Sequence, residues 1–251
     1  MNQESHWDKI GAKYNDEIFD VFKSDKDKKL RKYFKKHGNQ NHTVIDFGCG
    51  TGKSFSYLSP LFKSILAIDI SAELLEIAKI SPYQNVEFKK IDLVNPTSKI
   101  EKANFAFCCN VVMLPEAEKS MAMLRTIRKS LKPDGTAIFV LPSLDSALYS
   151  AWQLIEWYKK ENVDADQIPA DELSIIKAKK TDLVDGIVYI DGVPTRHYSA
   201  SQLEVWFTKA GLKITAIDKI EYDWDSEFSS PPKWMKEPYP WDWLVECKLD
   251  T

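Results

Sequence analysis

The chain has 251 residues, of which 44% are hydrophobic and 28% are charged, and its net charge is −3. This composition is typical of a globular domain and excludes a disordered or collagen-like chain. No apolar run approaches the roughly 20 residues that a helix needs to span a bilayer. The first ten residues lack the apolar core of a secretory signal. The four cysteines form no CxxC pair and no metal-ligand cluster with histidine. We therefore expect one cytoplasmic domain over residues 1–251, with reduced thiols, no metal and no membrane partner.

Residues 1–40 are expected to form a helical segment ahead of a sheet. Between Lys23 and His37, the residues Leu30, Tyr33 and Phe34 fall at helical spacing with lysines between them. The pattern favours an amphipathic helix with a solvated basic face. A binding patch for RNA is the alternative, which the net negative charge weakly opposes.

From residue 43 onward, short apolar runs alternate with helical patterns. The runs that are typical of strands cover residues 43–47, 64–70, 85–92, 103–114 and 136–141. Helical patterns cover residues 71–80 and 116–131. This alternation predicts an α/β fold with a mostly parallel, Rossmann-like sheet and helices on both faces. Ligands of such sheets bind at the carboxyl ends of the strands.

After Pro142 the alternation is interrupted by an insertion, residues 143–198. It contains a helical pattern at 144–160 and a predicted hairpin at 186–198, with a DG turn between two strand-like runs. A helix at 199–211, which Gly211 can cap, and strands at 213–220 and 243–249 follow. Because the insertion follows the fifth strand, we expect it to form a cap on the substrate side.

The stretch "DFGCGTGKS", residues 46–54, ends like the phosphate-binding loop of an ATPase. That loop requires a glycine at position 47, where the chain has Phe47. A dinucleotide fingerprint requires a glycine at position 53, where the chain has Lys53. What remains is Asp46 followed by glycines at alternate positions, which let a backbone turn sharply and approach a ligand. The acid favours a ligand portion that is cationic or rich in donors.

Two further acids narrow the class of ligand. Asp69 ends the next strand, 17 residues after Gly52, where a carboxylate of a Rossmann-like sheet accepts from both ribose hydroxyls. Asp92 ends the third strand and can accept from an exocyclic amine such as that of adenine. An adenosine with a cationic group over the glycine loop is therefore expected. S-adenosyl-L-methionine (SAM) has these parts.

Five motifs in this order resemble those of class I SAM-dependent methyltransferases of the small-molecule type. They are "VIDFGCGTG", "AIDIS", "KKIDL", "FAFCCNVVML" and "LKPDGTAIFVLP". The resemblance covers residues 40–142 and, more loosely, 196–249. It implies a seven-stranded, mostly parallel sheet whose last strand is antiparallel, with helices on both faces and an inserted cap. It also implies SAM as cofactor and S-adenosyl-L-homocysteine (SAH) as product.

The resemblance assigns the glycine loop to the methionine part of the cofactor. The loop residues concerned are Asp46, Gly48, Cys49, Gly50 and Gly52. The N-terminal "WDKIGAKYND" resembles a segment that folds over SAM, which would bring Tyr14 near the cofactor. Lys53 departs from the family's pattern, and its role stays open.

The resemblance also assigns the later strand ends. Asp69 would hold the ribose and Ile70 would pack on the adenine. Asp92 and Leu93 would meet the adenine amine and ring. Asn110 would lie beside the sulfonium and the methionine tail. Each position has a structural alternative, since acids also cap helices and end strands.

The substrate is less well defined. The fourth strand ends in "NVVM", whereas methyltransferases that act on nucleobase amines often carry a proline pair there. His197 could act as a base and, with Tyr198, touch the substrate; local bonding within the hairpin is the alternative. The aromatic residues between Tyr222 and Trp241 could line a pocket or pack the domain edge. A general base is required only where the nucleophile arrives protonated.

The resulting hypothesis is methyl transfer from SAM to a small organic molecule, at an O, N, S or C atom. Methylation of RNA is the alternative within the same enzyme class. A SAM-binding module without turnover is the alternative from another class.

Overall fold

The computed structural model describes residues 3–10, 19–169, 172–173, 180–190 and 192–250. Tyr14, expected near the cofactor, lies outside the described residues. None of the helices in these ranges is both long enough and apolar enough to cross a membrane.

Seven strands form one sheet in the order β3-β2-β1-β4-β5-β9-β8. Strands β1 to β5 pair in parallel, whereas β9 pairs antiparallel with both β5 and β8. The last strand therefore runs against the other six, which confirms the predicted α/β fold class. The strands are β1 (Asn39–Phe47), β2 (Phe62–Asp69), β3 (Val86–Lys90), β4 (Ala103–Cys109), β5 (Leu131–Pro142), β8 (Leu212–Glu221) and β9 (Trp241–Leu249).

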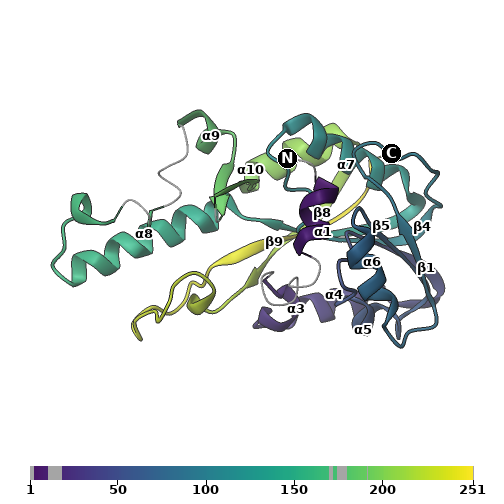
Figure 1. Ribbon diagram of the computed structural model, residues 1–251, viewed down its shortest axis with the longest axis horizontal. Helices are drawn as coiled ribbons and strands as arrows, with labels where there is room; N and C mark the ends of the chain where they lie inside the picture. The colour runs from purple at the N-terminus through teal and green to yellow at the C-terminus, as the bar shows by residue number, and fades with distance from the viewer. Residues whose placement is uncertain (1–2, 11–18, 170–171, 174–179, 191, 251) are drawn as a thin grey trace.

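Helices pack on both faces of this sheet (Figure 1). Buried side chains of α4, α5 and α6 belong to the core of one face, and those of α7 and α10 to the core of the other. The helices before the cap are α1 (Gln3–Ile10), α3 (Val21–Ser24), α4 (Lys29–His37), α5 (Phe55–Leu58), α6 (Ala72–Lys79) and α7 (Ala117–Lys129).

Strand β4 shows why a central strand is apolar throughout. Its alternate residues Phe105 and Phe107 face the α4 side, while Ala106 and Cys108 face the α7 side. All four are buried to within 1% exposure. A strand with helices on both faces has no solvent side, so it carries no polar alternation.

The prediction of one strand over residues 103–114 was too long, because β4 ends at Cys109. Asn110 follows in the left-handed region, with φ of 53°. Val111 then packs against Gly48 of the glycine loop. The apolar residues after 109 serve this contact and the cleft rather than the sheet.

The insertion contains α8 (Leu144–Lys160), a 3-10 turn η2 (Ala165–Gln167) and α9 (Lys180–Val184). It also contains a two-stranded hairpin of β6 (Ile187–Ile190) and β7 (Val193–Arg196), as predicted from the DG turn. Figure 1 shows α8 extending away from the sheet. The chain returns to the sheet through α10 (Ala200–Ala210), which Gly211 ends with φ of 77°.

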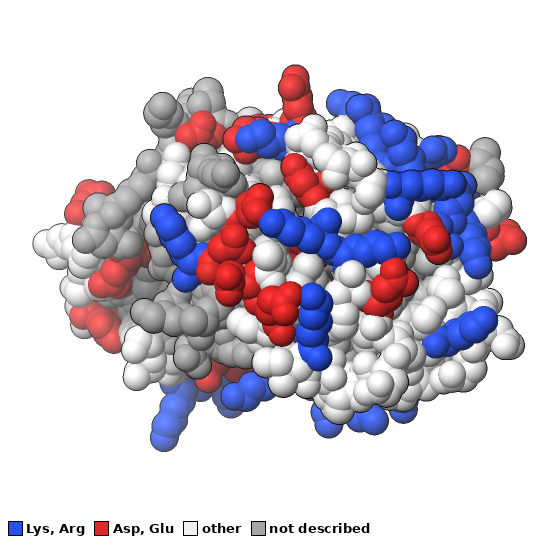
Figure 2. Space-filling view, turned by 45° about the vertical axis from the view of Figure 1, so that its right-hand side comes forward, with Lys and Arg blue, Asp and Glu red and all other residues white. Residues whose placement is uncertain are grey.

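The basic run between Lys23 and His37 is divided between the end of α3, at Lys23 and Ser24, and α4, which begins at Lys29. The buried residues of α4 are Leu30 and Phe34, which occupy the predicted apolar face. Lysines of this region bind acids of the C-terminal strands and the segment between them: Lys26 pairs with Asp223, Lys29 with Asp218 at 2.9 Å, and Lys36 with Glu246 at 2.7 Å. Figure 2 likewise shows a face on which basic and acidic side chains lie next to each other. Three of the basic residues in this run are thus engaged within the protein itself.

Candidate functional site

A cleft of about 1330 Å³ lies along the carboxyl ends of the parallel strands. Its lining divides into two halves. The first half consists of the glycine loop and the ends of β2 and β3. The second half consists of α8, the β6–β7 hairpin and the segments that flank β8 and β9. Asn110 lies between them at the end of β4, next to the point where the strand order reverses.

The glycine loop is shaped by positive φ angles and by close packing. Gly48, Gly50 and Gly52 have φ of 70°, 53° and 83°. A Cβ at Gly48 would lie 2.1 Å from Val111 Cγ2, and a Cβ at Gly52 would lie 2.4 Å from the ring of Phe55. The loop therefore requires glycine both for its conformation and for the approach of its neighbours.

Replacing Gly48 with alanine is expected to cost more stability than replacing Gly192. Both glycines have φ near 75°, which costs an L-residue roughly 1–2 kcal/mol. Only Gly48 adds a clash, since a Cβ at Gly192 meets no described atom within 4 Å. We expect Gly48→Ala to lower the free energy of unfolding by about 1–3 kcal/mol more than Gly192→Ala. Urea unfolding of both variants checks this, and equal losses would contradict the packing role of Gly48.

Asp46 lies beneath the loop and is 2% exposed. The Ser54 hydroxyl donates to its Oδ2. Burial raises the pKa of Asp46 to about 7, the Ser54 bond lowers it, and the neighbouring charge of Asp69 raises it. The end of the "GKS" stretch is thus engaged within the protein, since Lys53 also pairs with Asp20 at 3.1 Å. Both contacts differ from those of a triphosphate-binding loop.

Asp69 fastens the glycine loop to the end of β2. Its Oδ2 accepts from the Gly50 backbone N–H at 2.8 Å, and its Oδ1 accepts from the Ser71 N–H at 2.9 Å. An ionised carboxylate offers about four acceptor sites, so acceptor capacity remains for ligand hydroxyls. Burial raises the pKa of Asp69, and the backbone donors oppose that shift.

The other residues predicted for the cofactor line the same half of the cleft. They are Cys49, Ile70, Asp92 and Leu93. Asp92 Oδ1 accepts from the Val94 N–H at 2.8 Å, which holds the turn after β3. The structure therefore brings together every described residue that was predicted for the cofactor, except that Gly50 and Gly52 shape the loop without lining the cleft.

The N-terminal helix α1 closes one side of this half. Its residues Gln3, Glu4 and Trp7 line the cleft. The Ser71 hydroxyl donates to Asp8 at 2.6 Å, and Glu4 pairs with Lys90 at 2.5 Å. Figure 1 shows α1 beside α6, in agreement with these contacts.

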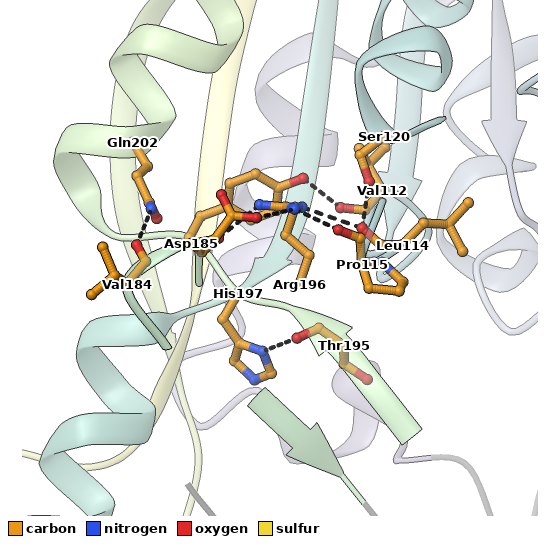
Figure 3. A network of polar contacts seen from close by, with 11 residues as sticks. Val112, Leu114, Pro115, Ser120, Val184, Asp185, Thr195, Arg196, His197 and Gln202 are labelled. Atoms are coloured by element: carbon orange, nitrogen blue, oxygen red, sulfur yellow. Dashed lines mark hydrogen bonds and ion pairs between the residues drawn. The ribbon is translucent and has the colours of Figure 1, made fainter. Parts of the chain in front are cut away.

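His197 lines the second half and is 7% exposed. Its Nδ1 lies 3.1 Å from the Thr195 carbonyl oxygen, which can only accept (Figure 3). The proton therefore resides on Nδ1, and Nε2 is an acceptor without a partner among the described residues. Burial lowers the pKa of His197 to about 4. A neutral imidazole with an open acceptor has the form that a base requires.

Replacing His197 with asparagine is expected to reduce the amount by which the free energy of unfolding falls at acid pH. The folded pKa of about 4 lies below the ordinary value of 6.5, so the unfolded chain binds the extra proton between these values. The contribution of His197 is therefore present above pH 6.5 and is lost as the pH falls toward 4. Between pH 7.5 and 4.5 the wild type should lose about 2–3 kcal/mol more than His197→Asn, in which the amide can still meet Thr195. Parallel losses in urea unfolding at the two pH values would show that His197 titrates normally.

The expectation for Tyr198 is not supported by its position. Tyr198 is 1% exposed and does not line the cleft. Its hydroxyl donates to the Val112 carbonyl at 2.8 Å, and its ring packs edge-on to Trp206. Successive residues after β7 point to different sides, so His197 faces the cleft and Tyr198 faces the core. Tyr198 is a packing residue here.

Arg196 joins the hairpin to the segment after β4, which the sequence did not indicate. Its guanidinium donates to the carbonyl oxygens of Leu114 at 3.2 Å, Pro115 at 2.6 Å and Asp185 at 2.8 Å (Figure 3). The Asp185 carboxylate accepts at 3.0 Å, and the Trp206 ring lies 4.9 Å from the guanidinium carbon. With 1% exposure, Arg196 fixes one wall of the cleft from behind.

Two charged or polar groups of the second half also escaped prediction. Asp242, near the start of β9, lines the cleft and accepts from the Tyr222 hydroxyl at 2.8 Å. Glu227, after the turn η4 (Trp224–Ser226), lines the same region beside Ser150. No group of three or more potential metal ligands occurs in the described part of the chain.

The sheet order, the glycine loop and the position of the cleft are those of a class I SAM-dependent methyltransferase. Comparison with known families gives the same class. The model of the methyltransferase domain family matches residues 21–217, so the chain belongs to this family.

Similar proteins carry the same description. The chain is 33% identical over 106 residues to "Putative methyltransferase 235L" of Invertebrate iridescent virus 6. The aligned segment covers 41% of this chain and 38% of that protein. The matched segments span less than half of the length of the curated relatives. A SAM-dependent methyltransferase from Anabaena variabilis ATCC 29413 superimposes with a TM-score of 0.65 at 17% identity, covering 99% of this chain and 96% of that one. The DhpI-SAM-HEP complex has a TM-score of 0.63 at 18% identity, with 98% and 95% covered.

Proposed function

We propose that the protein transfers a methyl group from SAM to a small organic molecule. The observation that carries this proposal is the continuity of the cleft. One cleft runs from the glycine loop and Asp69 to His197 and Asp242 under the inserted helix and hairpin.

The residues of the first half fit SAM. Asp69 and Asp92 would hold the ribose and the adenine amine, while Ile70 and Leu93 supply apolar contact for the ring. The Oδ1 atom of Asn110 is buried and lacks a hydrogen-bond partner in the described structure. A buried acceptor of this kind is unusual, and the ammonium group of a methionine tail would satisfy it. The DhpI structure, which is similar in fold, is a complex with SAM.

When bound, SAM supplies an electrophilic methyl group on a sulfonium. The protein's own contribution would then be positioning, which can supply several kcal/mol in favourable cases. The glycine loop and Asn110 would hold the cofactor at the junction of the two halves of the cleft. The walls of the second half would exclude water and orient the substrate. His197 Nε2 is available to accept a proton from a hydroxyl or an amine.

The test is transfer of labelled methyl from SAM into a fractionated cell extract by the purified protein. Label in the small-molecule fraction is the expected result. Label in RNA or protein would refute the substrate class while keeping the reaction. Binding of SAM without label in any fraction would favour a binding module without turnover.

A further inference from the structure

Asp242 occupies a position from which it can meet a substrate rather than the cofactor. It belongs to β9, and it pairs in register with Pro142 at the end of β5. The acids assigned to the cofactor lie at the carboxyl ends of β1, β2 and β3, on the other side of Asn110 in the strand order. Asn110 lies close enough to Asp242 to lower the pKa of its carboxyl. Asp242 therefore lies on the substrate side of the junction, next to it.

The carboxyl of Asp242 lacks a positive partner within the described protein. Its contacts are the Tyr222 hydroxyl and the nearby Asn110 amide, both neutral. Burial raises its pKa to about 7, the two neutral groups oppose the shift, and the charge of Glu227 adds to it. An ionised carboxylate in this setting carries an uncompensated cost, which a cationic ligand would offset.

The cations of the cleft do not suit an acidic substrate. Two lysines occur among the described lining residues, Lys53 and Lys119. Lys53 pairs with Asp20 at 3.1 Å, and Lys119 pairs with Glu116 at 2.7 Å. The buried guanidinium of Arg196 does not line the cleft. A carboxylate or phosphate on the substrate would meet the carboxyl groups of Asp242 and Glu227 without a described cation to balance it.

An unsatisfied polar atom and aromatic rings complete this region. Trp241 lines the cleft, is 9% exposed, and leaves Nε1 without a hydrogen-bond partner in the described structure. An orphaned polar atom in a well-buried residue at a cleft wall indicates a ligand that supplies the missing partner. Tyr222 and Phe228 add aromatic surface beside it. Rings of this kind favour a cationic group with an apolar body.

We propose that the region around Asp242 binds the ammonium group of a small organic amine, with Asp242 as its counter-ion. The inference rests on the proposed function, in that it names the substrate class of the same cleft. Asp242 can also accept one proton from the bound ammonium, so that R–NH₃⁺ and the carboxylate become R–NH₂ and the carboxylic acid. The nitrogen then carries a free lone pair while the proton stays on Asp242.

The test is calorimetric binding to the protein saturated with SAH, which holds no transferable methyl group. Three matched triads serve as probes: butylamine, phenethylamine and tryptamine, each with its corresponding alcohol and carboxylic acid. We expect at least one amine to bind tenfold or more tightly than its alcohol, and the acids to bind most weakly. Asp242→Asn should reduce the affinity for that amine to the level of the alcohol. Asp225→Asn, which changes a nearby exposed acid outside the cleft, should leave it unchanged.

The pH dependence gives a second readout on the same complex. Asp242 faces Tyr222, which directly follows β8, Glu227 from the segment after η4 and Cys109 from β4. Since the carboxylate is the binding form, the affinity for the amine should rise about tenfold between pH 6 and pH 8. The alcohol should show no such rise.

The possible failures are distinguishable. No preference for the amine in any triad, including no binding by any member, would overturn the inference. A preference that survives in Asp242→Asn would overturn it as well. Failure of the folded wild type to bind SAH would instead contradict the proposed function. Amine binding that is lost in Asp242→Asn would still support the amine site in that case.

Discussion

Replacing Arg196 with methionine is expected to lower the free energy of unfolding by about 3–5 kcal/mol. The guanidinium donates to three carbonyl oxygens, of Leu114, Pro115 and Asp185, and to one carboxylate oxygen. The Leu114 oxygen keeps a second donor, the Ser120 hydroxyl at 2.9 Å, so the loss falls mainly on the other two carbonyl oxygens. Each buried acceptor that loses its donor costs roughly 1–3 kcal/mol, although these costs do not add fully. Methionine keeps much of the apolar stem but donates nothing. Urea unfolding at neutral pH measures the loss.

Two matched controls separate the stability that comes from the hydrogen bonds of the guanidinium to carbonyl oxygens from the stability that comes from its ion pair with Asp185. The Asp185 side chain is 60% exposed, so Asp185→Asn should cost less than about 1 kcal/mol. Arg196→Lys keeps the charge but cannot reach the carbonyl oxygens as a fork, and it should be nearly as damaging as the methionine variant. A loss below 1 kcal/mol in Arg196→Met would contradict the role of Arg196 in holding the wall.

Replacing Asp69 with alanine is expected to weaken SAM binding tenfold or more, which is at least about 1.4 kcal/mol. The change would remove a charge-assisted bond to the ribose, worth roughly 1.5–3 kcal/mol. It would also release the Gly50 N–H from the 2.8 Å bond that holds the glycine loop. Both effects act in the same direction. Calorimetric titration of the folded variant with SAM measures the affinity.

Two further variants keep this result interpretable. Asp69→Asn retains a carbonyl oxygen for the loop but loses the negative charge, so its affinity should fall between those of the wild type and the alanine variant. Glu76→Ala removes an exposed acid of α6 that pairs with Lys79, and it should bind SAM like the wild type. Unchanged affinity in Asp69→Ala would show that the ribose does not lie at Asp69.

Most of the fold could be predicted from the sequence because its signals are local. The helix at residues 144–160 and the hairpin with its DG turn follow from periodicity and turn chemistry, and the structure has both. The parallel order follows from the alternation of strands and helices. The end of β4 could not be read in this way, since Val111 to Met113 are as apolar as the strand itself. In the structure the chain turns at Asn110, and Val111 packs against Gly48, a contact between segments that are far apart in the sequence.

In the candidate site, likewise, the cofactor residues could be predicted from the sequence, whereas most substrate residues could not. The cofactor residues lie one after another at strand ends, so their spacing is visible in the sequence. The substrate residues depend on which way a side chain points in a short hairpin. The run "RHYS" does not reveal that Arg196 and Tyr198 are buried while His197 faces the cleft. Asp242 and Asn110 are far apart in the chain, and they meet because β9 inserts between β5 and β8.

The most direct test of the account is calorimetric titration of the wild-type protein with SAM, repeated with SAH and with ATP. The account predicts that one SAM binds per chain, that SAH competes with it, and that ATP does not displace it. A folded protein that binds neither SAM nor SAH, or that releases SAM in favour of ATP, would contradict the assignment of the glycine loop and Asp69 to SAM.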